Sequence, residues 1–195
     1  MKQKHKRSMR IHPDWKWITT IFGSTIGISG AMSFLSGEVL AGGGLALSFV
    51  VLLGIILIGV IFDIIGVAVT AAEERPFHSM AAKKVPEAMI AIRLLRKAER
   101  VSSFCNDVVG DICGVISGSA SAVIAANAFQ VGSSDLETVL QLLMSALVAG
   151  MTVGGKAFGK SIAMGNSTTI VHTASKIIYS FRSIPGLIGK LFRKR

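Results

Sequence analysis

The chain has 195 residues, of which 51% are hydrophobic and only 16% are charged, and its formal net charge is +10. This composition is too apolar for an ordinary soluble domain and indicates a protein that lies largely in lipid. The basic residues are not interleaved with stacking aromatic residues, which argues against nucleic acid as the partner.

The segment 1–17 is basic and is followed by an apolar stretch, 18–36, that is rich in Gly, Ser and Thr. A secretory signal peptide has the same layout. Because no convincing small-x-small cleavage site follows, we predict a basic N-terminus over 1–17 and a retained transmembrane helix over 18–36.

Three further stretches match the roughly 20 apolar residues that a hydrocarbon core of about 30 Å requires. They are 44–72, 104–129 and 136–155. The sequence therefore predicts an all-α polytopic membrane protein with about four transmembrane helices.

All 21 Lys and Arg residues fall in three blocks, 2–16, 75–100 and 156–195. The loops between the first and second spans and between the third and fourth carry none. Four spans put the three blocks on one side, as the positive-inside rule requires. We therefore predict a multi-pass protein of the cytoplasmic membrane, with both termini in the cytoplasm and its basic face against an anionic inner leaflet.

The juxtamembrane segment 76–102 contains Pro76 and Pro86, which both favour helix starts. From Glu87 onward, apolar and basic residues alternate at helical spacing, which predicts an amphipathic helix on the inner leaflet. A solvated helical hairpin that only connects two spans explains the pattern equally well. The segment 161–195 alternates in the same way and predicts one or two basic interfacial helices, broken near Pro185, which complete a helical belt.

Three acids lie within the predicted spans, namely Asp63, Asp107 and Asp111. An Asp at mid-membrane costs about 2.5 to 3.5 kcal/mol, so each acid is a candidate functional residue. With Asn106 they offer the oxygen ligands that Mg²⁺ prefers. Small and hydroxyl-bearing residues predict a narrow polar seam beside these acids; they include Gly66, Thr70, Gly110 and Ser117.

Two other interpretations of the acids remain open. In one, the acids have a purely structural role: they are protonated, or hydrogen-bonded to Ser, Thr and Asn, and hold the bundle together. In the other, Lys156 at the inner end of the fourth span neutralises an acid, and its depth matches that of Asp107.

No enzyme motif is present. Cys105 and Cys113 would be about 12 Å apart along a helix, too far for a disulfide. The histidines have no zinc-type spacing, and neither G-x-S-x-G nor a P-loop occurs. Apart from the candidate Mg²⁺, the sequence predicts no cofactor.

Three segments have a familiar order: "FDIIGVAVTAAEERPFHSMA", "LLRKAERVSSF" followed by Asn106, and "VGGKAFGKSIAMGNSTTIVHTASKII". Together they resemble the transmembrane domain of the CNNM/CorB family of magnesium transporters, over about Gly44 to Arg182. The resemblance implies a CorB-like membrane domain over 44–160 with one extra helix before it. It also implies a homodimer that binds Mg²⁺ between polar and acidic side chains.

The chain departs from the family pattern at the expected ligands. Asp63 stands at the Ser and Gly66 at the Glu of a Ser-x-x-Glu motif, and Lys156 replaces a second Glu. Asp63, Asp107 and Asp111 would replace the missing acids, or Lys156 would take the place of the cation. The sequence has neither the CBS pair nor the CorC-type domain of longer members, so we expect any regulator to be a separate protein.

Two functions follow from these patterns. The first is divalent-cation transport, with Asp63, Asn106 and Asp111 as ligands and Asp107 at the cytoplasmic entrance. The alternative is a non-transporting scaffold or accessory subunit whose seam is neutralised by Lys156.

Overall fold

The computed structural model describes residues 14–42, 44–128 and 134–192, and every regular element in this part of the chain is a helix. Helices that are long and apolar enough to cross a membrane cover Trp15–Glu38, Leu45–Ala71, Ala98–Ala128 and Thr138–Gly165. The predicted all-α architecture with four spans is therefore confirmed.

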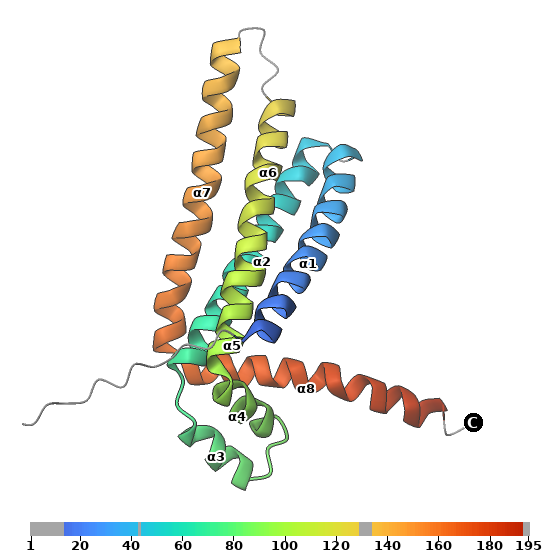
Figure 1. Ribbon diagram of the computed structural model, residues 1–195, viewed down its shortest axis with the longest axis vertical. Coiled ribbons are helices and arrows are strands. Elements are labelled where there is room, and N and C mark those ends of the chain that lie inside the picture. Colours follow the sequence, from blue (N-terminus) through green and yellow to red (C-terminus); the bar gives the residue numbers. More distant parts are fainter. Residues whose placement is uncertain (1–13, 43, 129–133, 193–195) are drawn as a thin grey trace, which may run out of the picture.

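The spans pack around a central helix. They are formed by α1 (Trp15–Gly42), α2 (Leu45–Ala71), α6 (Asp111–Ala128) and α7 (Ser134–Gly165). Figure 1 shows α2, α6 and α7 side by side, and α2 contacts each of the other spans. The third span begins earlier than predicted, because α5 (Ala98–Ser103) and a π-helix, η1 (Phe104–Gly110), lead directly into α6.

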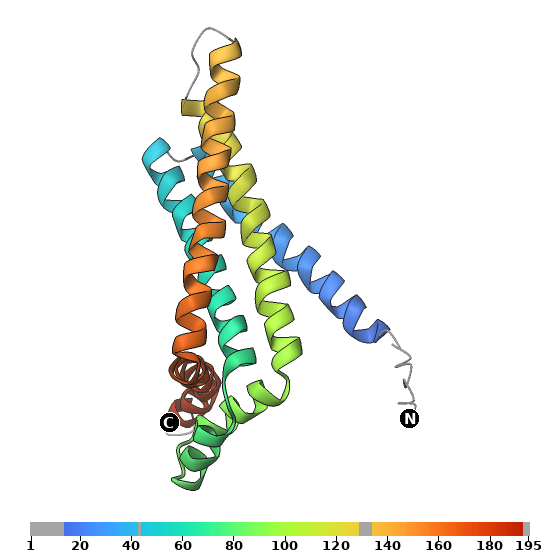
Figure 2. The ribbon, with the colours of Figure 1, turned by 90° about the vertical axis from the view of Figure 1, so that its left-hand side faces the viewer.

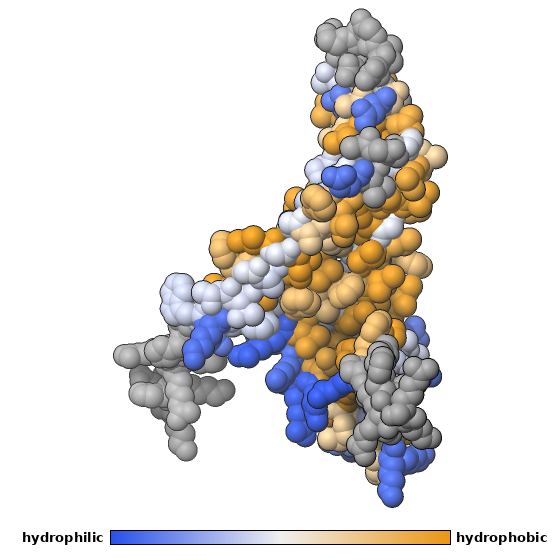
Figure 3. Space-filling view, turned by 90° about the vertical axis from the view of Figure 1, so that its right-hand side faces the viewer, coloured by the Kyte–Doolittle hydropathy of each residue, from blue (hydrophilic) through white to orange (hydrophobic). Residues whose placement is uncertain are grey.

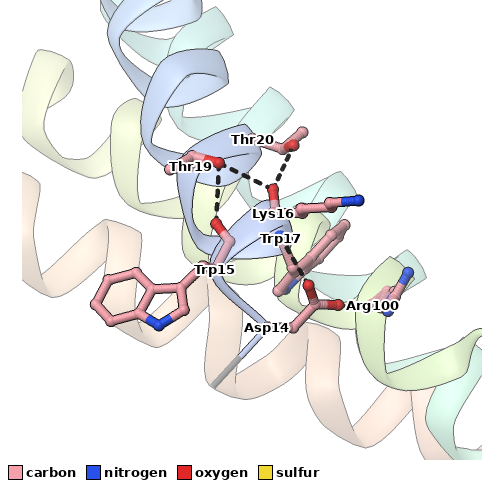
Figure 4. A network of polar contacts seen from close by, with 7 residues as sticks. All are labelled: Asp14, Trp15, Lys16, Trp17, Thr19, Thr20 and Arg100. Atoms are coloured by element: carbon pink, nitrogen blue, oxygen red, sulfur yellow. Dashed lines mark hydrogen bonds and ion pairs between the residues drawn. The ribbon is translucent and has the colours of Figure 1, made fainter. Parts of the chain in front are cut away.

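The first span is the least attached. Figure 2 shows the start of α1 leaning away from the other spans. A polar network at this end ties it to α5 (Figure 4): Asp14 Oδ2 pairs with Arg100 Nη2 at 3.0 Å, and the Arg100 guanidinium lies 5.1 Å from the centre of the Trp17 ring. Both charged side chains are more than half exposed, so the pair contributes at most about 1 kcal/mol.

Helices α3 (Arg75–Ala82), α4 (Ala88–Arg96) and α8 (Ser167–Phe192) gather at one end of the bundle, and we call them the belt. Pro76 lies in the first turn of α3, as predicted. The predicted break near Pro185 is wrong, since α8 continues through it as one helix; a proline removes one backbone donor without necessarily ending a helix. Helix α7 extends to Gly165, and a turn at Asn166 separates it from α8.

The apolar face of α4 is buried within the protein. Ala91, Ile92 and Leu95 form a cluster with Phe77 of α3, and Val69 of α2 and Val171 of α8 belong to the same cluster. The amphipathic pattern of α4 therefore anchors the hairpin to α2 and α8, and the prediction that this face lies on the leaflet is wrong.

The outer surface of the spans is apolar. Leu57 of α2, Phe22 of α1 and Leu142 of α7 each expose more than half of their side chains. Figure 3 shows that apolar residues cover much of the spans, while hydrophilic residues gather at the belt end. So large an exposed apolar surface is incompatible with water and suits a lipid surrounding.

Candidate functional site

Three charged side chains from three different spans meet inside the bundle. Lys156 Nζ of α7 lies 3.9 Å from Asp63 Oδ1 of α2 and 3.8 Å from Asp111 Oδ1 of α6. We call these residues the charged triad. Two carboxylates and one ammonium give it a formal charge of −1.

The triad lies far from the belt-end termini of its helices. At 1.5 Å per residue, Asp63 is about 12 Å from the end of α2 at Ala71, and Lys156 is about 14 Å from the end of α7 at Gly165. The hydrocarbon core measures about 30 Å. The triad therefore lies at a depth that falls within the hydrocarbon core.

The two acids have different surroundings. The Asp63 side chain is 16% exposed and that of Lys156 is 23% exposed, whereas Asp111 is 71% exposed. Asp111 and Lys156 line a groove of about 450 Å³ between α6 and α7. Its other lining residues are mostly small or hydroxyl-bearing, including Gly110, Gly114, Ser117, Gly118, Ser145, Ala149 and Thr152. Asp111 thus faces an open groove, and Asp63 faces the packed interior.

Glycines allow the spans to come this close. A Cβ atom at Gly110 would lie 3.3 Å from Lys156 Nζ and 3.8 Å from Asp63 Oδ1. A Cβ atom at Gly159 of α7 would be 2.6 Å from the Ile64 side chain of α2. Small residues are what lets helix backbones approach in a membrane, and here they bring the three charges together.

The π-helix η1 changes the direction of Asp107, which lies within it. In an α-helix, Asp107 and Asp111 would share a face, as the sequence predicts. In the structure Asp107 is exposed in a separate groove of about 370 Å³, beside Trp17 and Ile21 of α1. π-Helical turns are wider than α-helical turns and recur at functional sites. The proposed pairing of Lys156 with Asp107 is therefore wrong, because Lys156 contacts Asp63 and Asp111 instead.

The Asn106 side chain has one hydrogen-bond acceptor without a partner among the described residues. Its Nδ2 donates a hydrogen bond to Ser102 Oγ at 3.3 Å, but its buried Oδ1 has no hydrogen-bond partner among the described residues. The amide packs directly against Gly66, where a Cβ atom would collide with it. Gly66 lies one helical turn from Asp63, so this free oxygen faces the same side of α2 as the triad.

The other predicted seam residues are satisfied locally. Ser117 is buried and its Oγ donates to Gly114 O at 3.0 Å. Thr70 is exposed near the end of α2, and its Oγ1 donates to Val67 O at 2.8 Å. Cys105 and Cys113 are buried free thiols.

Across residues 14–42, 44–128 and 134–192, no group of three or more His, Cys, Asp and Glu side chains could hold a metal ion.

No family model, curated protein or solved structure matches this chain. The resemblance to the CNNM/CorB membrane domain thus rests on the residues quoted above, and what it implies about ions and partners stays a prediction.

The sequence identified all three members of the triad as candidate residues, but it did not predict that they contact one another. It did not find the network that joins Asp14, Trp17 and Arg100, nor the contact between His172 Nε2 and Glu87 Oε1, 3.5 Å apart, which joins α8 to the start of α4. Arg100 lies 86 residues from Asp14, and His172 is similarly distant from Glu87, so no local pattern links them.

Substituting Gly66 by alanine tests the close packing around Asn106. We expect the Gly66→Ala variant to lose about 1 to 3 kcal/mol of stability, because the new methyl group would push the Asn106 amide and the Cys105 side chain aside. The matched control is Gly54→Ala on the same helix, where no atom lies within 4 Å of the added Cβ. Equal unfolding temperatures for the two variants in detergent would contradict the packing.

Proposed function

We propose that the protein transports a divalent cation, with Mg²⁺ as the first candidate, and that Asp63 and Asp111 hold the ion. The observation that carries this proposal is the unequal charge of the triad, in which two carboxylates share one ammonium. An acid without a counter-charge inside a span is costly. A cation that binds there removes this cost.

The chemistry of the ligands supports a hard cation. Carboxylate and amide oxygens are the groups that Mg²⁺ prefers, usually with several waters retained. Asp63 and Asp111 supply carboxylates from two spans, and the unpartnered Oδ1 of Asn106, which packs against Gly66 one turn from Asp63, is an amide oxygen. Asp107 faces α1 and is left out of the proposed ligand set.

Lys156 gives the site a competitor for the ion. Its ammonium lies between the two carboxylates, so a cation enters only when this group withdraws. A lysine has a flexible four-carbon stem and can move without a change in the helix. We propose that the ammonium and the transported ion alternate at the same carboxylates.

The direction of the chain in the membrane belongs to the same proposal. We assign the basic belt and both termini to the cytoplasm and the protein to the cytoplasmic membrane, since the opposite loops carry no Lys or Arg. A homodimer and a separately encoded regulatory protein are the partners that the family resemblance implies. We propose no enzymatic activity.

A non-transporting scaffold or accessory subunit is the second candidate. It is favoured by the position of Lys156 within 4 Å of both acids, which an internal ion pair requires. In this role the triad would fix the packing of three spans, and no ion would move.

A cation titration separates the two functions. We expect Mg²⁺ to raise the unfolding temperature of the purified protein in detergent in a saturable way, because a ligand that binds only the folded state stabilises it by about 2.7 kcal/mol at one hundred times its dissociation constant. Asp63→Asn and Asp111→Asn should both remove this shift and also the uptake of Mg²⁺ into liposomes that contain the protein.

The matched control is Asp107→Asn, which removes an acid of the same span outside the triad and should keep the shift and the uptake. Ca²⁺, Mn²⁺, Co²⁺ and Na⁺ serve as comparisons for selectivity. A flat response of the wild-type protein to every ion would reject transport and leave the scaffold as the function.

A further inference from the structure

The corner between α2 and α8 contains an apolar groove. Figures 1 and 2 show α8 running across the belt end of the bundle, crosswise to the spans. Ile61 and Ile65 of α2 and Ile170 and Ile177 of α8 line a groove of about 280 Å³ at this corner. Ile61 and Ile177 are each 52% exposed, so the groove opens to the surroundings.

This groove is separate from the charged triad. At 3.6 residues per turn, Ile61 and Ile65 each lie about 200° around α2 from Asp63. Ile64 also lines the groove and lies about 100° around α2 from Asp63. No member of the triad lines the groove, so a ligand in it does not touch the triad.

The faces of α8 have distinct surroundings. Val171 and Ser175 are fully buried, and Val171 belongs to the cluster formed with α4. Ile177 and Phe181 lie on another face and are 52% and 70% exposed. Lys176 is exposed on the flank of the groove, beside Thr173, which is one of its lining residues. An amphipathic helix with an open apolar face and basic flanks is typical of the membrane interface.

The surroundings of the groove favour an anion. From Ser167 to Arg182, α8 contains Lys176 and Arg182 but no Asp or Glu. A lysine at the edge of an apolar face can extend its ammonium to the headgroup level while its stem stays among apolar groups. An occupant with an apolar chain and an anionic head satisfies both parts of the surface.

We propose that this groove binds an acyl chain of an anionic phospholipid, with Lys176 holding the phosphate of its headgroup. The side chains of the groove favour a lipid over a second copy of this protein. Helix pairs in membranes meet through small residues that let their backbones approach. Here five of the eight lining residues are isoleucines, and their branched side chains keep another helix at a distance while they pack well against a flexible chain.

The test compares lipids that stay bound to the purified full chain. The protein is reconstituted in nanodiscs of phosphatidylcholine, with or without phosphatidylglycerol, and co-purifying lipid is counted by native mass spectrometry after transfer to detergent. We expect the wild type to retain phosphatidylglycerol in preference to phosphatidylcholine. Lys176→Gln should weaken retention of phosphatidylglycerol about fivefold, the factor that corresponds to about 1 kcal/mol for one lysine at an anionic surface.

Two further variants make the outcome specific. Lys83→Gln removes an exposed cation of the belt outside α8 and should retain lipid as the wild type does. Ile177→Ser removes an exposed apolar side chain of the groove and should reduce the retention of both lipids without unfolding the protein. Asp111→Asn should leave lipid retention unchanged, which separates this site from the proposed cation site.

Three results would overturn the proposal. One is equal retention of the two phospholipids by the wild type. Another is an equal loss in Lys176→Gln and Lys83→Gln, which would show general attraction to the basic belt. The third is a dimer in detergent that Ile177→Ser dissociates, which would show that a second copy occupies the groove.

Discussion

Replacing Lys156 by methionine will lower the free energy of unfolding by about 3 kcal/mol, the loss expected when one partner of a largely buried ion pair is removed. The variant leaves Asp63 and Asp111 without the ammonium that they share, so the local formal charge changes from −1 to −2. The measurement is thermal or chemical unfolding in detergent. The matched control is Lys160→Met, one turn further along α7, where the exposed lysine belongs to no described ion pair.

Removing one of the two carboxylates should cost much less stability than removing the ammonium. Asp63→Asn leaves Lys156 paired with Asp111, so the remaining charges balance. The double variant Asp63→Asn/Lys156→Met should recover part of the loss, because an uncompensated buried carboxylate has been removed. Additive losses in this double-mutant cycle would show that the two residues do not interact.

The Lys156 variant also discriminates between the two candidate functions. If the carboxylates hold a transported ion, Lys156→Met removes the competitor, and Mg²⁺ will recover the lost stability at lower concentration than it acts on the wild type. If the triad is purely structural, the variant will stay destabilised at every Mg²⁺ concentration. The two results cannot both be obtained from one protein.

Replacing Phe77 by alanine will destabilise the belt by about 3 to 5 kcal/mol, the range for large-to-small substitutions in a packed core. Phe77 is fully buried in the cluster that joins α3 and α4 to α2 and α8. Loss of its ring leaves a cavity inside this cluster. We expect a lower unfolding temperature and faster proteolysis in the connection between α3 and α4.

Met89→Ala is the control for Phe77. Met89 lies on α4 but is 52% exposed, so its loss should change stability by less than about 0.5 kcal/mol. Similar unfolding curves for the two variants would mean that the hairpin is held by something other than this cluster. The same result would support the alternative that α4 is part of a solvated connection between two spans.

The number of spans and the helical class can be read from the sequence alone. The thickness of the bilayer sets the length of a span. A run such as 45–62, which has no charged residue, therefore identifies a span directly. The sequence also identified Asp63, Asp111 and Lys156 as residues of interest, because charged side chains inside such segments are costly. These properties are local and can be read along the chain.

Which charges meet depends on how the helices pack in three dimensions. The rotation of each helix depends on close contacts such as Gly159 against Ile64, and the π-helix η1 turns Asp107 toward α1 while Asp111 faces Lys156. Neither effect has a periodicity that a sequence reveals. Likewise, the apolar face of α4 has the same pattern whether it meets lipid or protein, and the choice depended on Phe77 and Val171 being placed beside it.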